Sequence, residues 1–393
     1  MKKISHKNLA KLQKRTQNNA LRRLKVPSGL VDFSSNDYLG FAKNEAIFNA
    51  SHQFLIDKNI KINGATGSRL LSGNHLLYTE VEAFLSALHE TETATVFNSG
   101  YDANIGFFSS VPQRGDVILF DEFIHASIRD GILLSNAKAY KFKHNNVTHL
   151  HEMLQRVSQD DSDIYVVTES VFSMDGDTPS LIELAEICKN NNAFLVVDEA
   201  HALGVFGTNG CGLVQHLNLQ NQVFARIVTF GKALGCHGAA ILGSNQLQQY
   251  LVNFARSFIY TTGLPPHSLA TIKTAYTFLN FDQQADSSQK LLQQNISFFK
   301  NEVEKLGLKA IFIESNSAIF SCVISGNEKV KGIATKLQSQ GFDVKAILSP
   351  TVPKNQERLR FCLHSYNSKK EITEVLCWLT IFVNTTTNIE INT

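Results

Sequence analysis

A lysine set among glycines is the residue of this chain best suited to covalent chemistry. Lys232 follows an apolar run that ends at Thr229, and it lies in the segment 231–235, Gly-Lys-Ala-Leu-Gly. Glycines allow a backbone or a ligand to approach closely. A lysine in such a pocket loses solvation, so its pKa falls and its amine becomes nucleophilic. The segment therefore favours a lysine that forms a Schiff base, against the ordinary alternative of a solvated surface lysine.

An acid and a histidine close another apolar run. Asp198 ends the run 194–197, and His201 follows three residues later, so a carboxylate and an imidazole should share one strand end. The letters DEAH are also the magnesium-binding box of helicases and other nucleotide-driven enzymes. That interpretation requires a GxxxxGK[ST] loop, which the sequence lacks. A capping aspartate is the structural alternative, so the pair alone predicts either a cap or a functional site.

Three further polar turns follow apolar runs. The segment 98–104 opens a predicted helix at Gly100, where free backbone N–H groups would suit a phosphate. His125 begins a second helix, and Ser173 lies in a dense polar turn. Taken singly, each is more often an ordinary turn or cap than a functional site. Because the carboxyl ends of parallel strands meet at one edge of a sheet, the five motifs together predict a single site.

Short apolar runs alternate with amphipathic stretches between residues 76 and 243. Continuous apolar strands separated by helices are typical of a mostly parallel sheet covered on both faces, so we expect an α/β fold. The predicted strands are 93–97, 117–120, 164–168, 194–197, 225–229 and 239–242. The predicted helices between them are 81–88, 126–134, 150–157 and 181–188.

The two ends of the chain differ from this central part. Residues 2–24 are polar with sparse leucines, which is typical of a surface helix, and the Pro-Ser-Gly at 27–29 should end it. Helices are predicted at 268–278 and up to Leu306, and the segments beyond form a smaller α+β domain. Those segments are 319–323, 333–337, 359–362 and 372–382. We expect three regions: an N-terminal helical arm (1–38), a large domain (39–278) and a C-terminal small domain (279–393).

The composition excludes several classes of partner. Hydrophobic residues make up 43% of 393 residues, enough for a substantial core, and the formal charge is only +2. This balance argues against nucleic acid or an anionic membrane as a partner. Six cysteines form no CxxC pair, so we expect reduced thiols and no metal. Without a secretory signal or an apolar run of about 18 residues, we expect a cytoplasmic protein.

The motifs, in this order, resemble those of the α-oxoamine synthases, pyridoxal-phosphate enzymes of fold type I. They span most of residues 34–266. The carrying segments are SSNDYLG (34–40), GATGSRLLSGNHLLYTEVE (64–82), NSGYDAN (98–104), FIHASIRDG (123–131), TESVFSMDGD (168–177), VVDEAHALGVFG (196–207), TFGKALG (229–235) and IYTTGLPP (259–266). The resemblance implies a seven-stranded, mostly parallel sheet, pyridoxal 5'-phosphate as cofactor, and a homodimer with the site between subunits.

The resemblance also implies roles for individual residues. Lys232 would carry the cofactor, Asp198 pair with its pyridinium nitrogen, His201 reach its phenolic oxygen, and His125 stack on its ring and touch substrate. Arg360 would hold the carboxylate of the amino acid. The other implied cofactor contacts are Gly100, Tyr101, Ser173 and Thr229, with Thr261 and Thr262 from the neighbouring subunit. The other implied substrate contacts are Arg22 and Thr351.

Three segments resemble the branch that condenses L-alanine with a pimeloyl thioester, carried by coenzyme A or acyl carrier protein, in biotin synthesis. They are 144–150, 254–266 and 349–353. One position departs from that branch: Leu348 stands where many members carry an arginine, which leaves the acyl donor open. The alternatives are a glycine C-acetyltransferase or another α-oxoamine synthase of different chain length, an aminotransferase or lyase of the same fold, and a non-catalytic scaffold.

Overall fold

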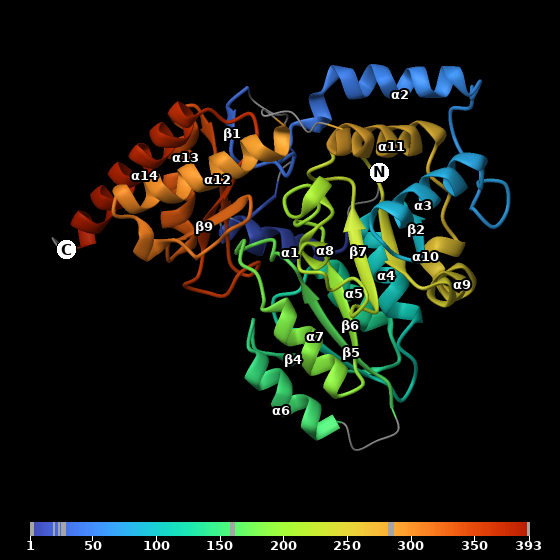
Figure 1. Ribbon diagram of the computed structural model, residues 1–393. Helices are drawn as coiled ribbons and strands as arrows, with labels where there is room; N and C mark the ends of the chain where they lie inside the picture. The colour runs from blue at the N-terminus through green and yellow to red at the C-terminus, as the bar shows by residue number, and fades with distance from the viewer. Residues whose placement is uncertain are drawn as a thin grey trace.

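The structure is a computed structural model that describes residues 4–18, 20–22, 24, 29–157, 162–281 and 287–390. A seven-stranded sheet with the order β2-β8-β7-β6-β5-β3-β4 forms its centre, with helices around it (Figure 1). The strands are β2 (Thr93–Phe97), β3 (Val117–Asp121), β4 (Lys138–Phe142), β5 (Ile164–Glu169), β6 (Phe194–Asp198), β7 (Ala225–Thr229) and β8 (Ala239–Gly243). Only β8 is antiparallel to its neighbours. The predicted α/β class and the mostly parallel seven-stranded sheet are confirmed.

The central strands are buried on both faces. In β5, Tyr165 and Val167 pack into one hydrophobic cluster, whereas Val166 packs into the other. In β6, Val196 and Val197 divide between the same two clusters. Successive side chains of a strand point to opposite faces, so a strand covered on both sides must be apolar throughout. This is why the apolar runs in the sequence located these strands.

The one strand of the large sheet that the apolar runs did not locate is β4. It pairs with β3 alone, at the edge of the sheet, and the first four of its five residues are exposed. An edge strand has less apolar cover and commonly carries lysines, as Lys138 and Lys141 illustrate. The sequence Lys-Ala-Tyr-Lys-Phe therefore has no signature of a buried strand.

The helices of the large domain cover the sheet and include α2, which with α11 forms an outer layer in Figure 1. Two helices start earlier in the chain than predicted. Helix α3 starts at Leu76, against a predicted start at residue 81, and α6 starts at Val147, against residue 150. The helices are α2 (Glu45–Asp57), α3 (Leu76–Leu88), α4 (Gly100–Ser110), α5 (Ala126–Leu134), α6 (Val147–Val157), α7 (Leu181–Asn190), α8 (Leu213–His216), α9 (Asn245–Phe254), α10 (Arg256–Ile259) and α11 (Pro266–Phe281). Within the described ranges, no helix has both the length and the apolar character to cross a bilayer.

The C-terminal part, orange to red in Figure 1, lies beside the large sheet. Its antiparallel sheet has the order β11-β12-β9, and a short parallel pair joins β1 to β10. Because β1 comes from residues 31–32, the chain contributes to this part before it enters the large sheet. The elements are β1 (Val31–Asp32), α12 (Ser288–Lys305), β9 (Ile319–Val323), α13 (Asn327–Ser339), β10 (Phe342–Asp343), β11 (Lys345–Ile347), β12 (Arg358–Cys362) and α14 (Lys369–Glu390).

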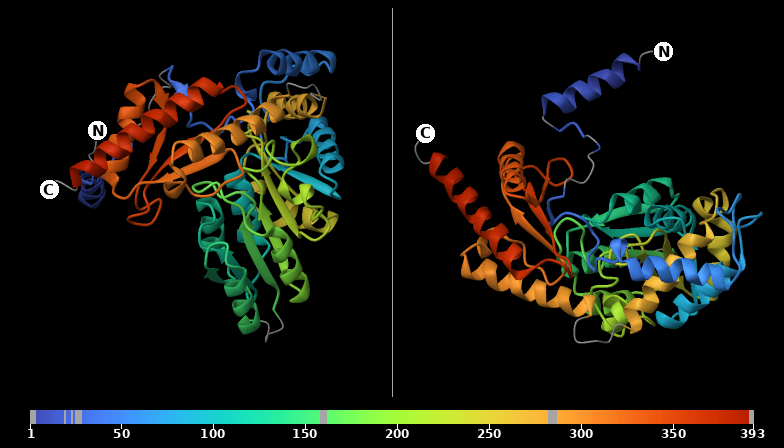
Figure 2. Two further views of the ribbon diagram at one scale, coloured as in Figure 1. Left: turned by 60° about the vertical axis from the view of Figure 1, so that its left-hand side comes forward. Right: turned by 90° about the horizontal axis from the view of Figure 1, so that it is seen from above.

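The N-terminal helix is shorter than the sequence pattern indicates. Helix α1 (His6–Gln17) begins at the cap residue Ser5 and ends at Gln17, whereas the polar pattern continues to residue 24. None of its residues is buried, and Figure 2 shows it standing away from the body in the view from above. A helix without tertiary contacts gains no stability from packing, so local capping sets its length.

A buried ion pair fixes the centre of the large domain. Arg226 on β7 and Glu199, just after β6, have side chains that are 1% and 0% exposed and lie 2.7 Å apart. Arg226 also donates to the carbonyls of His89 and Cys211, and Glu199 accepts from the backbone N–H of Val214. The glutamate of the Asp-Glu-Ala-His segment is therefore structural, and it is fully engaged inside the core.

We predict that Arg226→Met lowers the free energy of unfolding by roughly 3–5 kcal/mol, because it leaves the Glu199 charge buried and unpaired. Urea denaturation followed by circular dichroism measures this loss. The control is Lys370→Met, whose side chain is 82% exposed in a loose pair with Glu374. Equal stability of the two variants would contradict the role assigned to the buried pair.

Candidate active site

The five predicted motifs meet at one edge of the large sheet. They follow β2, β3, β5, β6 and β7, which run in the same direction. Hydrogen bonds join the loops directly: Asn104 to Asp198, His125 to Glu169, and Lys232 to His201. The structure thus brings together residues that are up to about 130 positions apart in the chain, as expected for the carboxyl edge of such a sheet.

Lys232 lies inside this edge with its amine against a histidine. Its Nζ is 2.7 Å from Nε2 of His201, whose Nδ1 is 2.7 Å from the hydroxyl of Tyr38. Burial lowers the pKa of Lys232 to about 8, although the nearby charges of Asp198 and Glu169 oppose this shift. Burial, and then the charge of Lys232, hold the pKa of His201 well below its ordinary value. The site therefore pairs an amine that loses its proton closer to neutral pH than an ordinary lysine with an imidazole that is uncharged.

Asp198 is a buried carboxylate held by neutral donors. Its Oδ2 accepts from the side-chain amide of Asn104 at 2.9 Å, and its Oδ1 accepts from the N–H of Ala200 at 2.9 Å. In the described part of the chain, no arginine, lysine or histidine forms an ion pair with it. A buried charge normally has a partner of opposite sign, so this carboxylate is suited to a cationic ligand.

His125 is the cap residue of α5, and its ring is fixed at one nitrogen. Nδ1 accepts from the N–H of Ser127 at 3.2 Å and lies 2.8 Å from the Ser127 hydroxyl. That hydroxyl accepts from Asn104, which also holds Asp198. Burial lowers the pKa of His125, against the charge of Asp198. One polar chain therefore orients both the imidazole and the carboxylate.

The N-terminus of α4 lies at the same sheet edge and adds a different kind of group to the site. Gly100 is its first residue, and a Cβ there would lie 3.5 Å from Cβ of Thr229. The Thr229 hydroxyl donates to the carbonyl of Gly238 at 3.1 Å. Asn98 donates to the hydroxyl of Thr261 at 3.0 Å and to the carbonyl of Thr262 at 2.7 Å. A helix start flanked by threonines is suited to an anion.

Arg360 reaches the same edge from β12 of the C-terminal part. It is 8% exposed, and Nε donates to the carbonyl of Ser173 at 2.7 Å. Nη2 donates to Asn36 at 3.0 Å, and Nη1 contacts the sulfur of Cys362 at 2.9 Å. No carboxylate of the described residues forms an ion pair with this buried guanidinium. A guanidinium without a counter-ion is suited to an anionic ligand, which it can bind through two parallel hydrogen bonds.

Comparison with known proteins assigns the family. The model of the aminotransferase class I and II family matches residues 28–377, and the chain belongs to this family. It is 40% identical, over 93% of its length and 92% of the relative, to the 8-amino-7-oxononanoate synthase of Emericella nidulans. It is 38% identical, over 86% and 84%, to a putative 8-amino-7-oxononanoate synthase of Bacillus cereus.

Solved structures agree with this assignment. A serine palmitoyltransferase of Sphingomonas wittichii matches with a TM-score of 0.86 and 27% identity, over 97% of both chains. The 8-amino-7-oxononanoate synthase of Francisella tularensis matches with a TM-score of 0.77 and 29% identity, over 91% of this chain and 99% of that one. The fold is that of the type I pyridoxal-phosphate transferases, and the chain is an enzyme that uses this cofactor.

The residues at the sheet edge fit this cofactor. The Asp198 carboxylate, which forms no ion pair with a described residue, would face the ring nitrogen, and the N-terminus of α4 at Gly100 would hold the phosphate. The Lys232 amine, with its lowered pKa, provides the nucleophile for the aldehyde. These features come from three different loops and together match the charges of one ligand.

Two predicted residues lie elsewhere in the single chain. Arg22 is exposed, beyond the end of α1, and Thr351 is exposed in the turn that follows β11. Tyr101 lies at the start of α4, but its hydroxyl donates to Asp130, on the surface. The roles of these residues stay predictions.

Several residues of the site were not singled out from the sequence. Tyr38 and Asn36 lie within the quoted segment 34–40, and Asn104 ends the segment 98–104. Ser127 and Glu169 likewise lie inside quoted motifs. Their positions at strand or helix ends were visible, but their partners are distant in the chain, so only the folded structure reveals the contacts.

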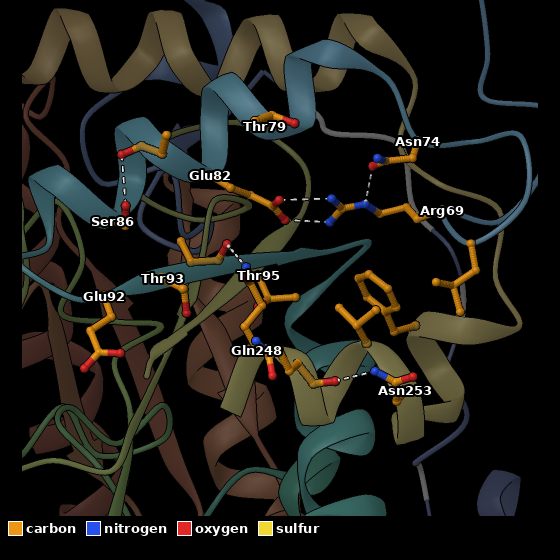
Figure 3. A pocket seen from close by; sticks show the side chains of 16 residues that line it. Arg69, Asn74, Thr79, Glu82, Ser86, Glu92, Thr93, Thr95, Gln248 and Asn253 are labelled. Atoms are coloured by element: carbon orange, nitrogen blue, oxygen red, sulfur yellow. Dashed lines mark hydrogen bonds and ion pairs between the residues drawn. The ribbon is translucent and has the colours of Figure 1, made fainter. Parts of the chain in front are cut away.

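A hollow of about 590 Å³ lies elsewhere, along the edge strand β2 between α3, α9 and α10. Figure 3 shows Arg69 there, bound through both ends of its guanidinium to Glu82 and through Nε to Asn74. None of the predicted catalytic residues lines this hollow. Its one arginine is already paired, so size alone does not make it the site.

We predict that covalent attachment of pyridoxal phosphate to Lys232 accelerates with pH, reaches half its maximal rate near pH 8 and then levels off, because the neutral amine is the nucleophile. Borohydride reduction followed by peptide mass spectrometry measures the attachment. Lys232→Met should abolish it, while the exposed control Lys141→Met should not. A rate that keeps rising toward the ordinary lysine pKa of 10.5 would contradict the lowered value.

Proposed function

We propose that this chain catalyses the reaction named in its relatives, the condensation of L-alanine with a pimeloyl thioester to give 8-amino-7-oxononanoate. The observation that carries the proposal is the buried Arg360, which has no carboxylate partner among the described residues and lies near Lys232. The guanidinium is close enough to lower the pKa of the Lys232 amine further, after burial, the larger cause. The site thus offers a place for an amino-acid carboxylate next to the place for the cofactor.

The overall reaction makes one carbon–carbon bond and breaks two bonds. Cα of alanine bonds to the acyl carbonyl carbon, and the sulfur leaves as a thiolate with the carbon–sulfur electrons. The amino-acid carboxylate leaves as CO₂, while its bonding electrons stay on Cα and take up a proton. Pyridoxal phosphate, when bound, withdraws electrons from Cα so that bonds at this carbon can break. The residues of the chain supply orientation, charge and proton transfer around that carbon.

Each residue at the sheet edge has a defined task in this proposal. Arg360 holds the carboxylate in a fork and so sets which bond of Cα stands perpendicular to the cofactor ring. Lys232 removes and returns the Cα proton, for which a pKa of about 8 is suited at neutral pH. Asp198 keeps the ring nitrogen charged, and His125 packs against the ring and contacts substrate.

The phosphate and the ring oxygen have their own partners in this proposal. We assign the phosphate to Gly100, Tyr101 and Thr229, and the phenolic oxygen to His201. Ser173 completes the wall of the cofactor pocket. These assignments follow from the resemblance and from the position of each residue at the carboxyl edge of the sheet.

The acyl donor is less constrained than the amino acid. Leu348 stands where many relatives carry an arginine, and its side chain packs against the hydrophobic core. It therefore offers no cation to a second carboxylate, which would suit an esterified or carrier-bound pimeloyl group. Coenzyme A and acyl carrier protein both remain candidate carriers, and Arg22 and Thr351 are proposed contacts to the substrate.

We also propose a homodimer with a shared site. Helix α1 buries none of its residues in the single chain, and Arg22, a short way beyond it, is exposed. Thr261 and Thr262, now bonded to Asn98, would reach the phosphate of the neighbouring subunit. The three regions 1–38, 39–278 and 279–393 and a cytoplasmic location remain parts of the same proposal, with no nucleic acid or membrane as partner.

We predict that mass spectrometry of products from an amino acid and thioester panel will identify alanine with a pimeloyl thioester as the preferred pair. The panel should include glycine, serine and aminobutyrate, with acetyl, pimeloyl, methyl-pimeloyl and palmitoyl thioesters. CO₂ should appear only when both substrates are present. Preference for glycine with acetyl, or serine with palmitoyl, would replace this proposal with a sister activity, and transamination alone would overturn the reaction type.

We predict that Arg360→Met raises the KM for the amino acid at least tenfold, because a charge-assisted hydrogen bond contributes roughly 1.5–3 kcal/mol. The KM for the acyl thioester should change little. Steady-state kinetics with each substrate varied in turn measures the change in each KM separately. An equal rise in both KM values would contradict a role specific to the carboxylate.

A further inference from the structure

His144 is a largely buried histidine that contacts a carboxylate at each ring nitrogen. It follows β4, and Nδ1 lies 2.9 Å from Oδ1 of Asp121 while Nε2 lies 2.8 Å from Oδ2 of Asp177. Its ring stacks on Phe123 with centroids 4.4 Å apart and meets the edge of Phe172 at 4.5 Å. Its side chain is 17% exposed. Two aromatic rings and two acids therefore fix its position on every side.

The first acid fixes the loop that leads to His125. Asp121 ends β3 and is fully buried, and its Oδ1 accepts from the N–H of Phe123 at 2.8 Å. Its Oδ2 accepts from the N–H of Asn145 at 2.8 Å. The carboxylate therefore determines how the chain leaves β3, four residues before His125 caps α5.

The second acid belongs to the turn that carries Ser173. The backbone carbonyl of Asp177 accepts from the N–H of Phe172 at 3.0 Å, which closes the turn 172–177. Asn145 also donates to the Asp177 carboxylate, at 2.7 Å. The position of Ser173 thus depends on where Asp177 is held.

The other side of the same turn is tied to the C-terminal part. Arg358 forms a buried ion pair with Asp175, and Ser321 donates to the carbonyl of Met174 at 2.5 Å. Arg360 donates to the carbonyl of Ser173. On the large-domain side, His144 and Asn145 provide the side-chain contacts to Asp177, and His144 contributes the aromatic packing as well.

We propose that His144, bonded at both ring nitrogens to Asp121 and Asp177, is a positioning residue that holds the Ser173 turn in register with the loop of His125. It lies outside the site and acts through its two acids. The inference rests on the proposed function only in assigning Ser173 and His125 to the cofactor pocket.

The charge of the ring follows from its contacts. A carboxylate only accepts hydrogen bonds, so two carboxylates require both nitrogens to donate, which is the imidazolium form. Burial lowers the pKa of His144, but the hydrogen bonds and charges of Asp121 and Asp177 raise it to about 9. Glu122 faces the segment through its contact with the N–H of His144 and is 3.6 Å from Lys141, and Asp175 is paired with Arg358. The charged groups facing the ring are therefore acids, and the outer two have other cations. The side-chain amide of Asn145, which donates to Asp177, also lies 3.2 Å from Nε2.

The same geometry argues against a metal ion. Ligand atoms of His144, Asp175 and Asp177 lie within 4.8 Å of one another. However, both ring nitrogens already face carboxylates, and Asp175 is occupied by Arg358. An imidazolium has no lone pair for a metal, so the cluster is a charge bridge.

The test compares His144→Gln with the matched control His151→Gln, an exposed histidine on α6. His144→Gln keeps bulk and one donor but loses the charge, and we expect it to raise the dissociation constant of pyridoxal phosphate about tenfold. Asp177→Asn should give a similar rise, and the double variant should be no worse than either single change. Fluorescence titration of the apoprotein with pyridoxal phosphate measures all four proteins without any acyl substrate.

The pH dependence provides a readout that simple loss of packing would not give. The native pKa of about 9 lies above the ordinary 6.5, so the bridge stabilises fully below about pH 6.5 and is lost as pH rises through 9. The difference in urea midpoint between the native protein and His144→Gln should therefore shrink over that range. Because Lys232 titrates in both proteins, its contribution cancels.

Nitrogen-15 NMR of the imidazoles supplies a direct check. The His144 ring should remain doubly protonated at pH 7.5 in the native protein and in the His151→Gln control. A neutral ring at that pH, unchanged cofactor affinity in His144→Gln, or strictly additive losses in the double variant would overturn the proposal. If the substrate panel fails while these results hold, the proposed reaction falls and the positioning role stands.

Discussion

The site depends on a buried carboxylate that forms no ion pair within the described part of the chain, although the Lys232 amine lies near enough for the two charges to interact. Asp198 ends β6 inside the protein, and only the neutral donors Asn104 and Ala200 contact it closely. Burying an ionised group in this way is costly unless an opposite charge arrives. Arg360, at the same edge, forms no ion pair with any carboxylate among the described residues. In the proposed reaction, the cofactor and the amino acid would supply the opposite charges for Asp198 and Arg360.

Two adjacent residues of the Asp-Glu-Ala-His segment have different roles, one in the site and one in the core. Asp198 turns to the site, whereas Glu199 turns into the core and pairs with Arg226. The glutamate is therefore unavailable to a magnesium ion, which agrees with the missing phosphate loop. The buried ion pair of Glu199 secures the junction of β6 and β7, the strands that deliver Asp198 and Lys232.

The turn 172–177 joins the two parts of the molecule at the site. The C-terminal part contacts this turn through an ion pair from Arg358 and hydrogen bonds from Arg360 and Ser321. The large domain contacts it through His144, which lies against Asp177. Gly176 allows the close approach, because a Cβ there would lie 2.1 Å from the carbonyl oxygen of Ile319 and its φ is +79°. Because Arg360 donates to the carbonyl of Ser173, an amino-acid carboxylate bound by Arg360 would be linked through this arginine to the turn 172–177.

The sequence by itself determined the α/β class, the buried strands and the five loops, because strands covered on both faces must be apolar throughout and their ends must be polar. It also placed Lys232, Asp198, His201, His125 and Ser173 at those ends. It could not determine β4, whose exposed residues leave no apolar run, or the end of α1 at Gln17. Only the tertiary structure decided that Asn104 holds Asp198, that Tyr38 meets His201, and that His144 bridges two loops. These pairs are 23 to 163 residues apart, and no local pattern encodes a contact made across separate strands.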